Sequence, residues 1–302
     1  MGRIAIVTDS NSGITREEAA ALGAYVVPMP FFIDGELYYE GITLTTQEFY
    51  KRMAAGSEIS TSQPTPGAVL ELWDELLETN DEVVYIPMSS GLSGSCATAT
   101  ALAEDYDGRV HVVDNQRISA TQRQSVIDAL NMARDGLSGA QITEVLLRER
   151  LEASIYITVD TLQYLKKGGR ITAAAAALGT VLGIKPVLQI QGDKLDAFSM
   201  AHGLKAAKRQ MLDAVERDLE KRFSGKRGVM VAAAYTCSEA EAEVWSDEIR
   251  ARFGERYCGY IAPLSLSVAC HTPSARVAMG GVQAAGPEYK RPNAECRAGR
   301  GF

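Results

Sequence analysis

The sequence predicts an α/β protein of two domains, an N-terminal parallel-sheet α/β domain and a C-terminal α/β domain with a mixed sheet. Apolar runs at residues 4–7, 83–88 and 109–113 each lead into a helix-type segment, which is typical of strands in a parallel sheet. Asp34-Gly35 and Gly192-Asp193 stand between further strand-type runs and predict two hairpins. A chain of 302 residues with 46% hydrophobic side chains can bury cores of this size.

Composition and charge narrow the range of partners. The net charge of −7, from 38 acidic and 31 basic residues, is not the footprint of a protein that binds nucleic acid or an anionic membrane. No long apolar segment opens the chain, so we expect no signal peptide and no stable membrane insertion. The five cysteines are scattered and never spaced as C-x-x-C, which favours reduced thiols and a cytoplasmic location. With three dispersed histidines, the sequence predicts no metal site, and we expect no cofactor.

The first strands and helices are separated by polar loops. Residues 3–7 predict a strand that ends in a polar loop at residues 8–13, after which Thr15 caps an alanine-rich helix. Residues 25–33 and 36–39 predict the two strands of the first hairpin.

Two helices follow, and hydroxyl side chains precede the second of them. Thr45-Thr46-Gln47-Glu48 is a capping box that opens the first helix. Thr65 and Pro66 begin the second helix, so Thr61 and Ser62 lie in the loop leading into it. Their hydroxyls either line a ligand site or serve turn chemistry alone.

Residues 83–95 place a turn rich in serine and glycine between a strand and a helix. The first turn of a helix leaves N–H groups unpaired, so this junction suits an anion. It lacks the lysine of a Walker A loop and the third glycine of a dinucleotide loop. Gly91-Leu92-Ser93-Gly94-Ser95 departs from the G-x-S-x-G nucleophile elbow only at its last position. An ordinary turn in which Ser95 caps the helix is the other interpretation.

The strand at residues 109–113 ends in Asp114-Asn115-Gln116. Parallel sheets bind ligands at the carboxyl ends of their strands, so we expect the polar loops at 8–13, 89–95 and 114–116 to share one edge. We place the domain boundary near residue 152, which gives domains at residues 1–152 and 153–285.

The second half opens with a short helix that ends at Gly168-Gly169 and presents Arg170 at a sharp turn. The guanidinium there contacts an anion or stabilises the helix end. Five consecutive alanines within residues 172–182 predict a closely packed helix. Further elements are predicted as a hairpin at 184–191 and 194–199, helices at 202–222 and 238–252, and a strand at 228–235.

The apolar run at residues 261–269 leads into Cys270-His271-Thr272. His111 lies within a predicted strand and His202 starts a helix, so both are expected to be structural. His271, at a strand end beside a hydroxyl, is better placed for chemistry. Residues 286–302 lack periodicity and predict a mobile tail.

Six short stretches together resemble the DegV family of bacterial fatty-acid-binding proteins, the FakB-type subunits of fatty-acid kinase. In family order over residues 3–272 they are Ile6-Val7-Thr8-Asp9-Ser10, Ser60-Thr61-Ser62-Gln63-Pro64, Ser89-Ser90-Gly91-Leu92-Ser93-Gly94-Ser95, Leu165-Lys166-Lys167-Gly168-Gly169-Arg170-Ile171, Leu182-Gly183-Ile184-Lys185-Pro186 and His271-Thr272.

The resemblance implies a two-domain protein that is not catalytic alone. It implies a long-chain fatty acid in an apolar tunnel between the domains, with its carboxylate presented to a separate ATP-binding subunit of fatty-acid kinase. The family's positions for the carboxylate are matched by Thr61, Ser62, Ser93, His271 and Thr272. Arg170 matches the arginine linked to phosphotransfer with the kinase partner.

The chain departs from the family pattern after the histidine. The family continues as His-x-Gly-Pro-Gly, whereas this chain has His271-Thr272-Pro273-Ser274-Ala275, so we expect a different backbone there. Two alternatives stay open. One is a serine hydrolase or acyltransferase with Ser93 as nucleophile and His271 as base, and the other is a sensor of a different small anion.

Overall fold

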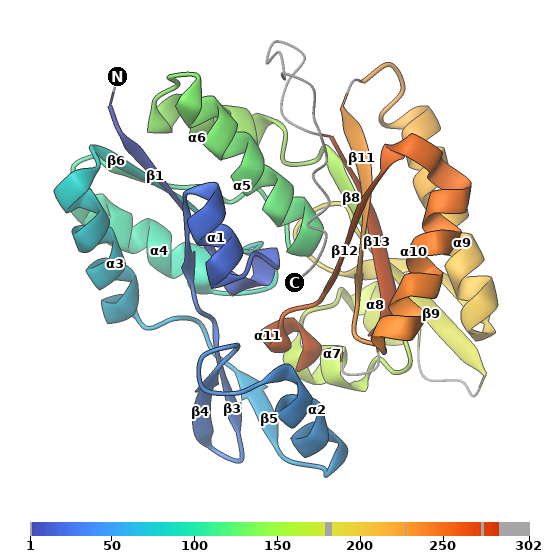
Figure 1. Ribbon diagram of the computed structural model, residues 1–302. Helices are drawn as coiled ribbons and strands as arrows, with labels where there is room; N and C mark the ends of the chain where they lie inside the picture. Colours follow the sequence, from blue (N-terminus) through green and yellow to red (C-terminus); the bar gives the residue numbers. More distant parts are fainter. Residues whose placement is uncertain (1, 179–182, 227, 273–274, 284–302) are drawn as a thin grey trace. The chain divides into compact units, whose positions relative to one another are not determined.

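The computed structural model describes residues 2–178, 183–226, 228–272 and 275–283 of the chain (Figure 1). The chain divides into two compact units, of which the first takes Met1–Arg150 and Ser265–Pro273 and the second takes Leu151–Leu264 and Ser274–Phe302. The sequence assigned residues 265–272 to the second domain, whereas the structure packs them into the first unit. The tail predicted at 286–302 lies outside the described residues.

A four-stranded sheet forms the centre of the first unit. Its strands are β1 (Ile4–Asp9), β2 (Ala24–Val27), β6 (Glu82–Ile86) and β7 (Val110–Val112). Their order is β2-β1-β6-β7, and every neighbouring pair is parallel. The parallel sheet predicted for this part of the chain is therefore confirmed.

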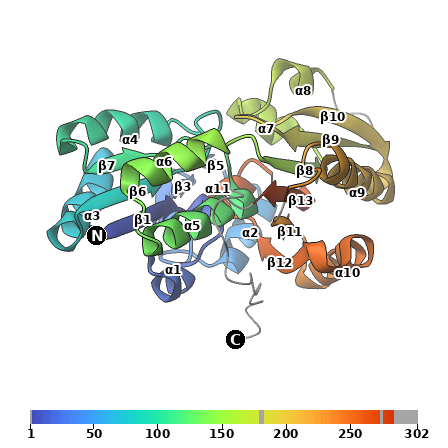
Figure 2. The ribbon, with the colours of Figure 1, turned by 90° about the horizontal axis from the view of Figure 1, so that it is seen from above.

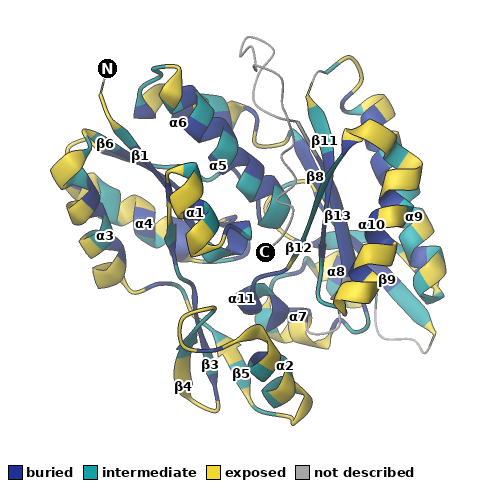
Figure 3. Cartoon of the chain, viewed as in Figure 1, coloured by how far each residue is buried: buried dark blue, intermediate teal, exposed yellow. Residues whose placement is uncertain are grey.

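Helices cover both faces of this sheet (Figure 1). They are α1 (Arg16–Leu22), α3 (Pro66–Thr79), α4 (Ser95–Ala103), α5 (Ser119–Arg134) and α6 (Gly139–Arg148), with short 3-10 turns η1 (Ser10–Ser12) and η2 (Glu104–Tyr106). Helix α3 begins as predicted, because Thr65 Oγ1 accepts a hydrogen bond from Ala68 N and Pro66 is the first helical residue. It buries Val69 and Trp73 against the sheet and exposes its other side (Figure 3).

A second, antiparallel sheet of order β4-β3-β5 belongs to the same unit. Its elements are β3 (Pro30–Ile33), β4 (Glu36–Tyr39) and β5 (Ile59–Thr61), with helix α2 (Thr46–Ala54) beside them. Asp34 and Gly35 both have positive φ, 52° and 84°, as the predicted hairpin turn requires. The single strand predicted at residues 25–33 is wrong, because β2 ends before Pro28, which lacks the N–H that a strand ladder needs.

The second unit contains a six-stranded sheet of order β10-β9-β8-β13-β11-β12. Its strands are β8 (Ala153–Val159), β9 (Ile184–Ile190), β10 (Asp196–His202), β11 (Val229–Tyr235), β12 (Tyr257–Pro263) and β13 (Ala275–Gln283). Only the β11–β12 pair is parallel, so the predicted mixed sheet is confirmed.

Two long helices cover one face of that sheet, and the elements of this unit are seen from above in Figure 2. The two long helices are α9 (Gly203–Lys221) and α10 (Glu239–Phe253). The unit also contains the short helices α7 (Gln163–Gly168) and α8 (Ala173–Ala177) and the 3-10 turn η3 (Gly254–Arg256). Met211 on α9 and Trp245 on α10 are fully buried in one apolar cluster with side chains of the strands. Among the helices of the described residues, none is long and apolar enough to cross a membrane.

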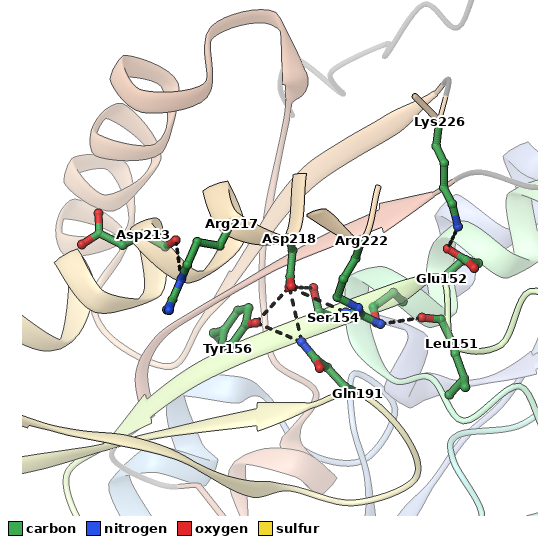
Figure 4. A network of polar contacts seen from close by, with 11 residues as sticks. Leu151, Glu152, Ser154, Tyr156, Gln191, Asp213, Arg217, Asp218, Arg222 and Lys226 are labelled. Atoms are coloured by element: carbon green, nitrogen blue, oxygen red, sulfur yellow. Dashed lines mark hydrogen bonds and ion pairs between the residues drawn. The ribbon is translucent and has the colours of Figure 1, made fainter. Parts of the chain in front are cut away.

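A buried polar network ties α9 to the first strand of this unit (Figure 4). Asp218, only 6% exposed, accepts hydrogen bonds from Ser154 Oγ at 2.6 Å and from Tyr156 Oη at 2.9 Å. Arg222, one helical turn later, donates to Leu151 O at 2.8 Å. The strand β8 is thus held to α9 by directional bonds as well as by apolar packing.

Candidate functional site

Polar groups from three loops meet at the carboxyl edge of the parallel sheet. Asp9 ends β1, and its Oδ2 accepts a hydrogen bond from Met88 N, after β6, at 2.7 Å. Ser90 N donates to Asp114 Oδ1, after β7, at 3.2 Å. The prediction that the loops after these three strands share one edge is therefore confirmed.

Asp9 is the most buried charge at this edge, with 0% of its surface exposed. Its Oδ1 accepts hydrogen bonds from Asn11 N at 3.0 Å and from Gln122 Nε2 at 3.2 Å. Burial raises the pKa of Asp9 to about 6, although the hydrogen bonds from Met88, Gln122 and Asn11 oppose this shift. Asp9 therefore holds the loop after β6 and the turn η1 in one arrangement.

The turn at residues 89–95 is built by its own serines. Ser89 O accepts hydrogen bonds from Leu92 N and Ser93 N, and Ser93 Oγ accepts one from Ser95 N at 3.2 Å. Ser95 is the first residue of α4 and not its cap, because Gly94 occupies the cap position without a side-chain bond. Ser95 Oγ is buried and has no hydrogen-bond partner among the described residues.

Thr61 and His271 form a direct pair. Thr61 is the last residue of β5, and its Oγ1 lies 2.9 Å from His271 Nε2. Which of the two donates depends on the tautomer of the ring. Both residues belong to the first unit, so the pair is internal to that unit.

Ser62 and Ser93 lie in neighbouring loops. Ser62 is exposed, and its N–H donates to Pro30 O at 3.3 Å. The next residue, Gln63, donates from Nε2 to Thr98 Oγ1 on α4 at 3.0 Å. A Cβ placed on Gly94 would lie 3.0 Å from Gln63 Oε1, so the two loops are in contact close to both serines.

His271 follows a single helical turn and does not follow a strand as predicted. Strand β12 ends at Pro263, and the chain then forms α11 (Leu266–Ala269). The turn forms because Leu266 and Ala269 are fully buried in a cluster with side chains of β3 and α2. Thr272 is buried, and its Oγ1 donates to Val268 O at 3.0 Å, so its hydroxyl proton is already engaged.

Two polar residues that the sequence analysis did not single out hold this turn. Asn11 Oδ1 accepts hydrogen bonds from the hydroxyls of Ser265 and Ser267. Glu40 Oε2 accepts one from Leu266 N at 2.9 Å. The signal for Asn11 was the polar loop after the first strand, whereas nothing in the local sequence around Glu40 indicates a partner more than 200 residues away.

Arg170 belongs to the second unit. The helix α7 ends as predicted, with Gly169 in the left-handed conformation at φ 70°. Arg170 is half-buried, and its guanidinium donates to Gly168 O. Its role toward a partner stays a prediction.

The backbone at Ser93 does not support the nucleophile elbow. In such an elbow the serine occupies a strained strand-to-helix turn. The non-glycine residues with positive φ in the described chain are Asp34, Asp107, Gln116 and Ser119, and Ser93 is not among them. Among all the residues that the structure describes, no three His, Cys, Asp or Glu side chains are grouped so that they could hold a metal ion.

Comparison with known proteins places this arrangement in one family. The model of a family described as "Uncharacterised protein, DegV family" matches residues 3–282. A DegV domain-containing protein of Deinococcus radiodurans is 39% identical over 215 residues, which cover 71% of this chain and 76% of that protein. A relative from Listeria innocua with the same domain description is 30% identical over 84% of this chain and 89% of its own length.

Solved structures give the same result. A Thermus thermophilus structure, described as fatty acid binding of a DegV family protein, superimposes with a TM-score of 0.82 at 29% identity and covers 93% of this chain and 99% of its own. The Bacillus subtilis structure of DegV, described as a fatty acid binding protein, has a TM-score of 0.81 at 25% identity over 94% of this chain and all of its own. The family model and these relatives, together with the shared fold, show that this chain belongs to the DegV family.

Proposed function

We propose that this protein binds a long-chain fatty acid and presents its carboxylate to a separate ATP-dependent fatty-acid kinase subunit. The carboxylate would be held in the first unit by Thr61, Ser62, Ser93 and His271, and by Thr272, whose hydroxyl would exchange its bond to Val268 O for one to the ligand. The acyl chain would lie in an apolar tunnel, and the protein would not be catalytic alone. A cytoplasmic location, where ATP is available, is part of the same proposal.

The Thr61–His271 hydrogen bond is the observation that carries this proposal. A carboxylate that leaves water needs charge-assisted hydrogen bonds to replace its hydration. A hydroxyl paired with an imidazole at 2.9 Å, close to a serine-rich turn, is a chemically suitable donor set. An acyl chain adds about 0.8 kcal/mol of affinity for each buried methylene, so the polar site has only to orient the ligand.

The relatives support the choice of ligand. Two structures that match nearly the whole chain are described as fatty-acid-binding DegV proteins. Because the similarity covers both units and the family pattern includes Thr61, Ser93 and His271, the same ligand class is the best hypothesis for this chain.

The kinase step needs a partner, because this chain has no Walker A sequence, and no lysine occurs between Lys51 and Lys166. In the proposed reaction, a carboxylate oxygen forms a bond to the γ-phosphorus of ATP on the partner while the bond to ADP breaks. The products are an acyl phosphate and ADP. Arg170 would support this step as a positive charge beside the transferred group.

Binding can be tested with a series of saturated fatty acids of increasing chain length and two variants of β5. Thr61→Ala should weaken binding about tenfold or more, because a hydrogen bond to a charged group contributes roughly 1.5–3 kcal/mol. Ser60→Ala is the matched control, since Ser60 is the exposed neighbour of Thr61 on the same strand. Affinity should rise with chain length and stay unchanged in the control. Equal affinity across the series, or equal loss in both variants, would contradict the proposal.

The kinase step has its own test. Arg170→Ala should bind fatty acid like the wild type and lose most acyl-phosphate formation when it is mixed with the ATP-binding kinase subunit and ATP. Lys221→Ala removes an exposed positive charge from the end of α9 in the same unit and should keep full transfer. Normal transfer by Arg170→Ala would remove Arg170 from the proposed mechanism without affecting the binding claim.

A further inference from the structure

The turn that carries His271 is too short to define its own position. Helix α11 has four residues, and an isolated helical turn is unstable in water. His271 follows two residues after its end and still reaches Thr61 Oγ1 at 2.9 Å. Contacts with the rest of the first unit must therefore set where this turn lies.

Apolar packing anchors one side of the turn. Leu266, Ala269 and Cys270 share a buried cluster with side chains of β3 and α2, among them Phe31 and Phe49. The hydrophobic effect is not directional, so this packing keeps the turn on the sheet without fixing its rotation. Directional bonds have to supply the remaining precision.

The directional bonds come from two acceptors. Asn11 Oδ1 receives the hydroxyls of Ser265 and Ser267, which fixes the start of the turn to η1. Glu40 Oε2 receives Leu266 N at 2.9 Å, which is the first N–H of α11. Glu40 follows β4 directly and forms a β-bridge with Leu44, so its own backbone is held in place.

Among the described residues, no charged side chain compensates the carboxyl of Glu40. Burial raises its pKa to about 7, and the hydrogen bond from Leu266 N opposes that shift only in part. No lysine or arginine of the described residues forms an ion pair with it. The titratable and charged groups on the elements around it are Glu36, Tyr38 and Tyr39 on β4, Glu48, Tyr50, Lys51 and Arg52 on α2, and Cys270 and His271 after α11. Of these, Arg52 donates hydrogen bonds to Glu48 and Tyr38. The pKa of the Cys270 thiol is raised mainly by burial and in smaller part by the charge of Glu40.

We infer that Glu40 is a positioning residue for His271: its carboxyl fixes the first N–H of α11 and so sets the point at which the turn brings the imidazole to Thr61. The effect on the ligand rests on the proposed function, because only then does this pair hold a carboxylate. The positioning itself does not depend on any ligand. Because the carboxyl gains and loses its proton near neutral pH, the geometry of the pair is expected to respond to pH in that range.

The test uses the full-length protein, stripped of lipid and labelled with ¹⁵N in its three histidines. Long-range ¹H–¹⁵N spectra report the ring nitrogens of His271, and His111, which bonds to Glu82 in the same unit, is the internal control. In the wild type, the His271 signals should shift in a step near pH 7 as Glu40 gains or loses its proton. Glu40→Gln keeps an acceptor for Leu266 N and cannot ionise, so it should preserve the His271 signals and lose that step.

Glu40→Ala removes the acceptor and should move the His271 signals toward those of Thr61→Ala. If Glu40→Ala does not fold, the loss of the step in Glu40→Gln decides the question. A pH step that persists in Glu40→Gln, or His271 signals in Glu40→Ala that match those of the wild type, would overturn the inference. A fatty-acid titration of the same samples separates the two claims: displaced His271 signals without fatty-acid binding in any sample would sustain the positioning and refute the proposed function.

Discussion

The bond between Thr61 Oγ1 and His271 Nε2 joins residues that are 210 positions apart in the chain. It exists because β5 and α11 both pack against one small apolar cluster that includes Phe31 and Phe49. The polar residues behind this pair, Asp9 and Glu40, both carry raised pKa values caused mainly by burial. At the scale of single residues, the site therefore combines a hydroxyl–imidazole pair with buried acids whose pKa values are raised.

Asp9 makes a prediction about stability and pH. Its pKa rises from 3.8 in the unfolded chain to about 6 in the fold, so the folded state binds this proton more tightly. This proton contributes roughly 3 kcal/mol to the free energy of unfolding. The contribution is fully present below pH 3.8 and is lost as the pH rises through about 6. Urea unfolding of the wild type and of Asp9→Asn over this range should show a stability difference that falls with rising pH. Parallel curves for the two proteins would contradict the assignment of the proton to Asp9.

The roles of Asp9 and Glu40 show what a sequence omits at this scale. Asp9 stands in a loop that the sequence identified as polar, and its partners Met88 and Gln122 became visible only in the fold. Thr61 and His271 were named in advance through the family resemblance, and their pairing depends on tertiary packing. Burial decides the chemistry of both acids, and burial is a property of the folded chain.

At the scale of elements, the local sequence was sufficient to predict those turns and helix ends that local interactions determine. The Asp34-Gly35 turn and the start of α3 at Thr65 and Pro66 follow from backbone preferences and capping. Helix α11 could not be predicted, because four residues form a helical turn here only through burial against β3 and α2. In the sequence, residues 261–269 form one apolar run that leads to a predicted strand end. In the structure, the hydroxyls of Ser265 and Ser267 donate to Asn11, and the run is divided between β12 and α11.

Two glycines, one in the first turn of α6 and one in the first turn of α3, should respond oppositely to alanine. A Cβ on Gly139 would lie 2.4 Å from Glu82 Oε2 and from His111 Cδ2, so Gly139→Ala must disturb the Glu82–His111 bond of 2.8 Å. A loss of roughly 1–3 kcal/mol in unfolding free energy is expected. Gly67 has nothing within 4 Å of the same position, so Gly67→Ala should be neutral or stabilise by up to about 1 kcal/mol. Thermal unfolding of both variants checks this, and an equal change in both would contradict the close contact of Gly139 with Glu82 and His111.

At the scale of the whole molecule, two units with separate cores share one chain that crosses between them more than once. The first unit contains residues 1–150 and also residues 265–273, which follow most of the second unit in the sequence. The length of the chain indicated two domains, the alternation of strands and helices indicated the parallel sheet of the first, and the hairpin at 184–191 and 194–199 indicated antiparallel pairing in the second. The return of α11 to the first unit depends on contacts between distant segments, so it could not be predicted from the sequence.

Because the two units have separate cores, we expect a destabilising substitution in one unit to leave the stability of the other unchanged. Asp218→Ala would leave Ser154 Oγ and Tyr156 Oη buried without their acceptor (Figure 4), at a cost of roughly 2–4 kcal/mol. Asp213→Ala on the same helix removes an exposed partner of Arg252 and should cost less than about 1 kcal/mol. Amide hydrogen exchange should increase in β8, β9 and α9 of Asp218→Ala and stay unchanged in β1 and β6. A uniform increase across both units would show that they unfold together.

Native mass spectrometry of the purified full-length protein, followed by denaturing extraction and lipid analysis, tests the central claim most directly. The account predicts a stoichiometric mass excess that extracts as a free long-chain fatty acid and decreases in Thr61→Ala but not in Ser60→Ala. A protein that is empty as purified and also takes up no added fatty acid would contradict the claim.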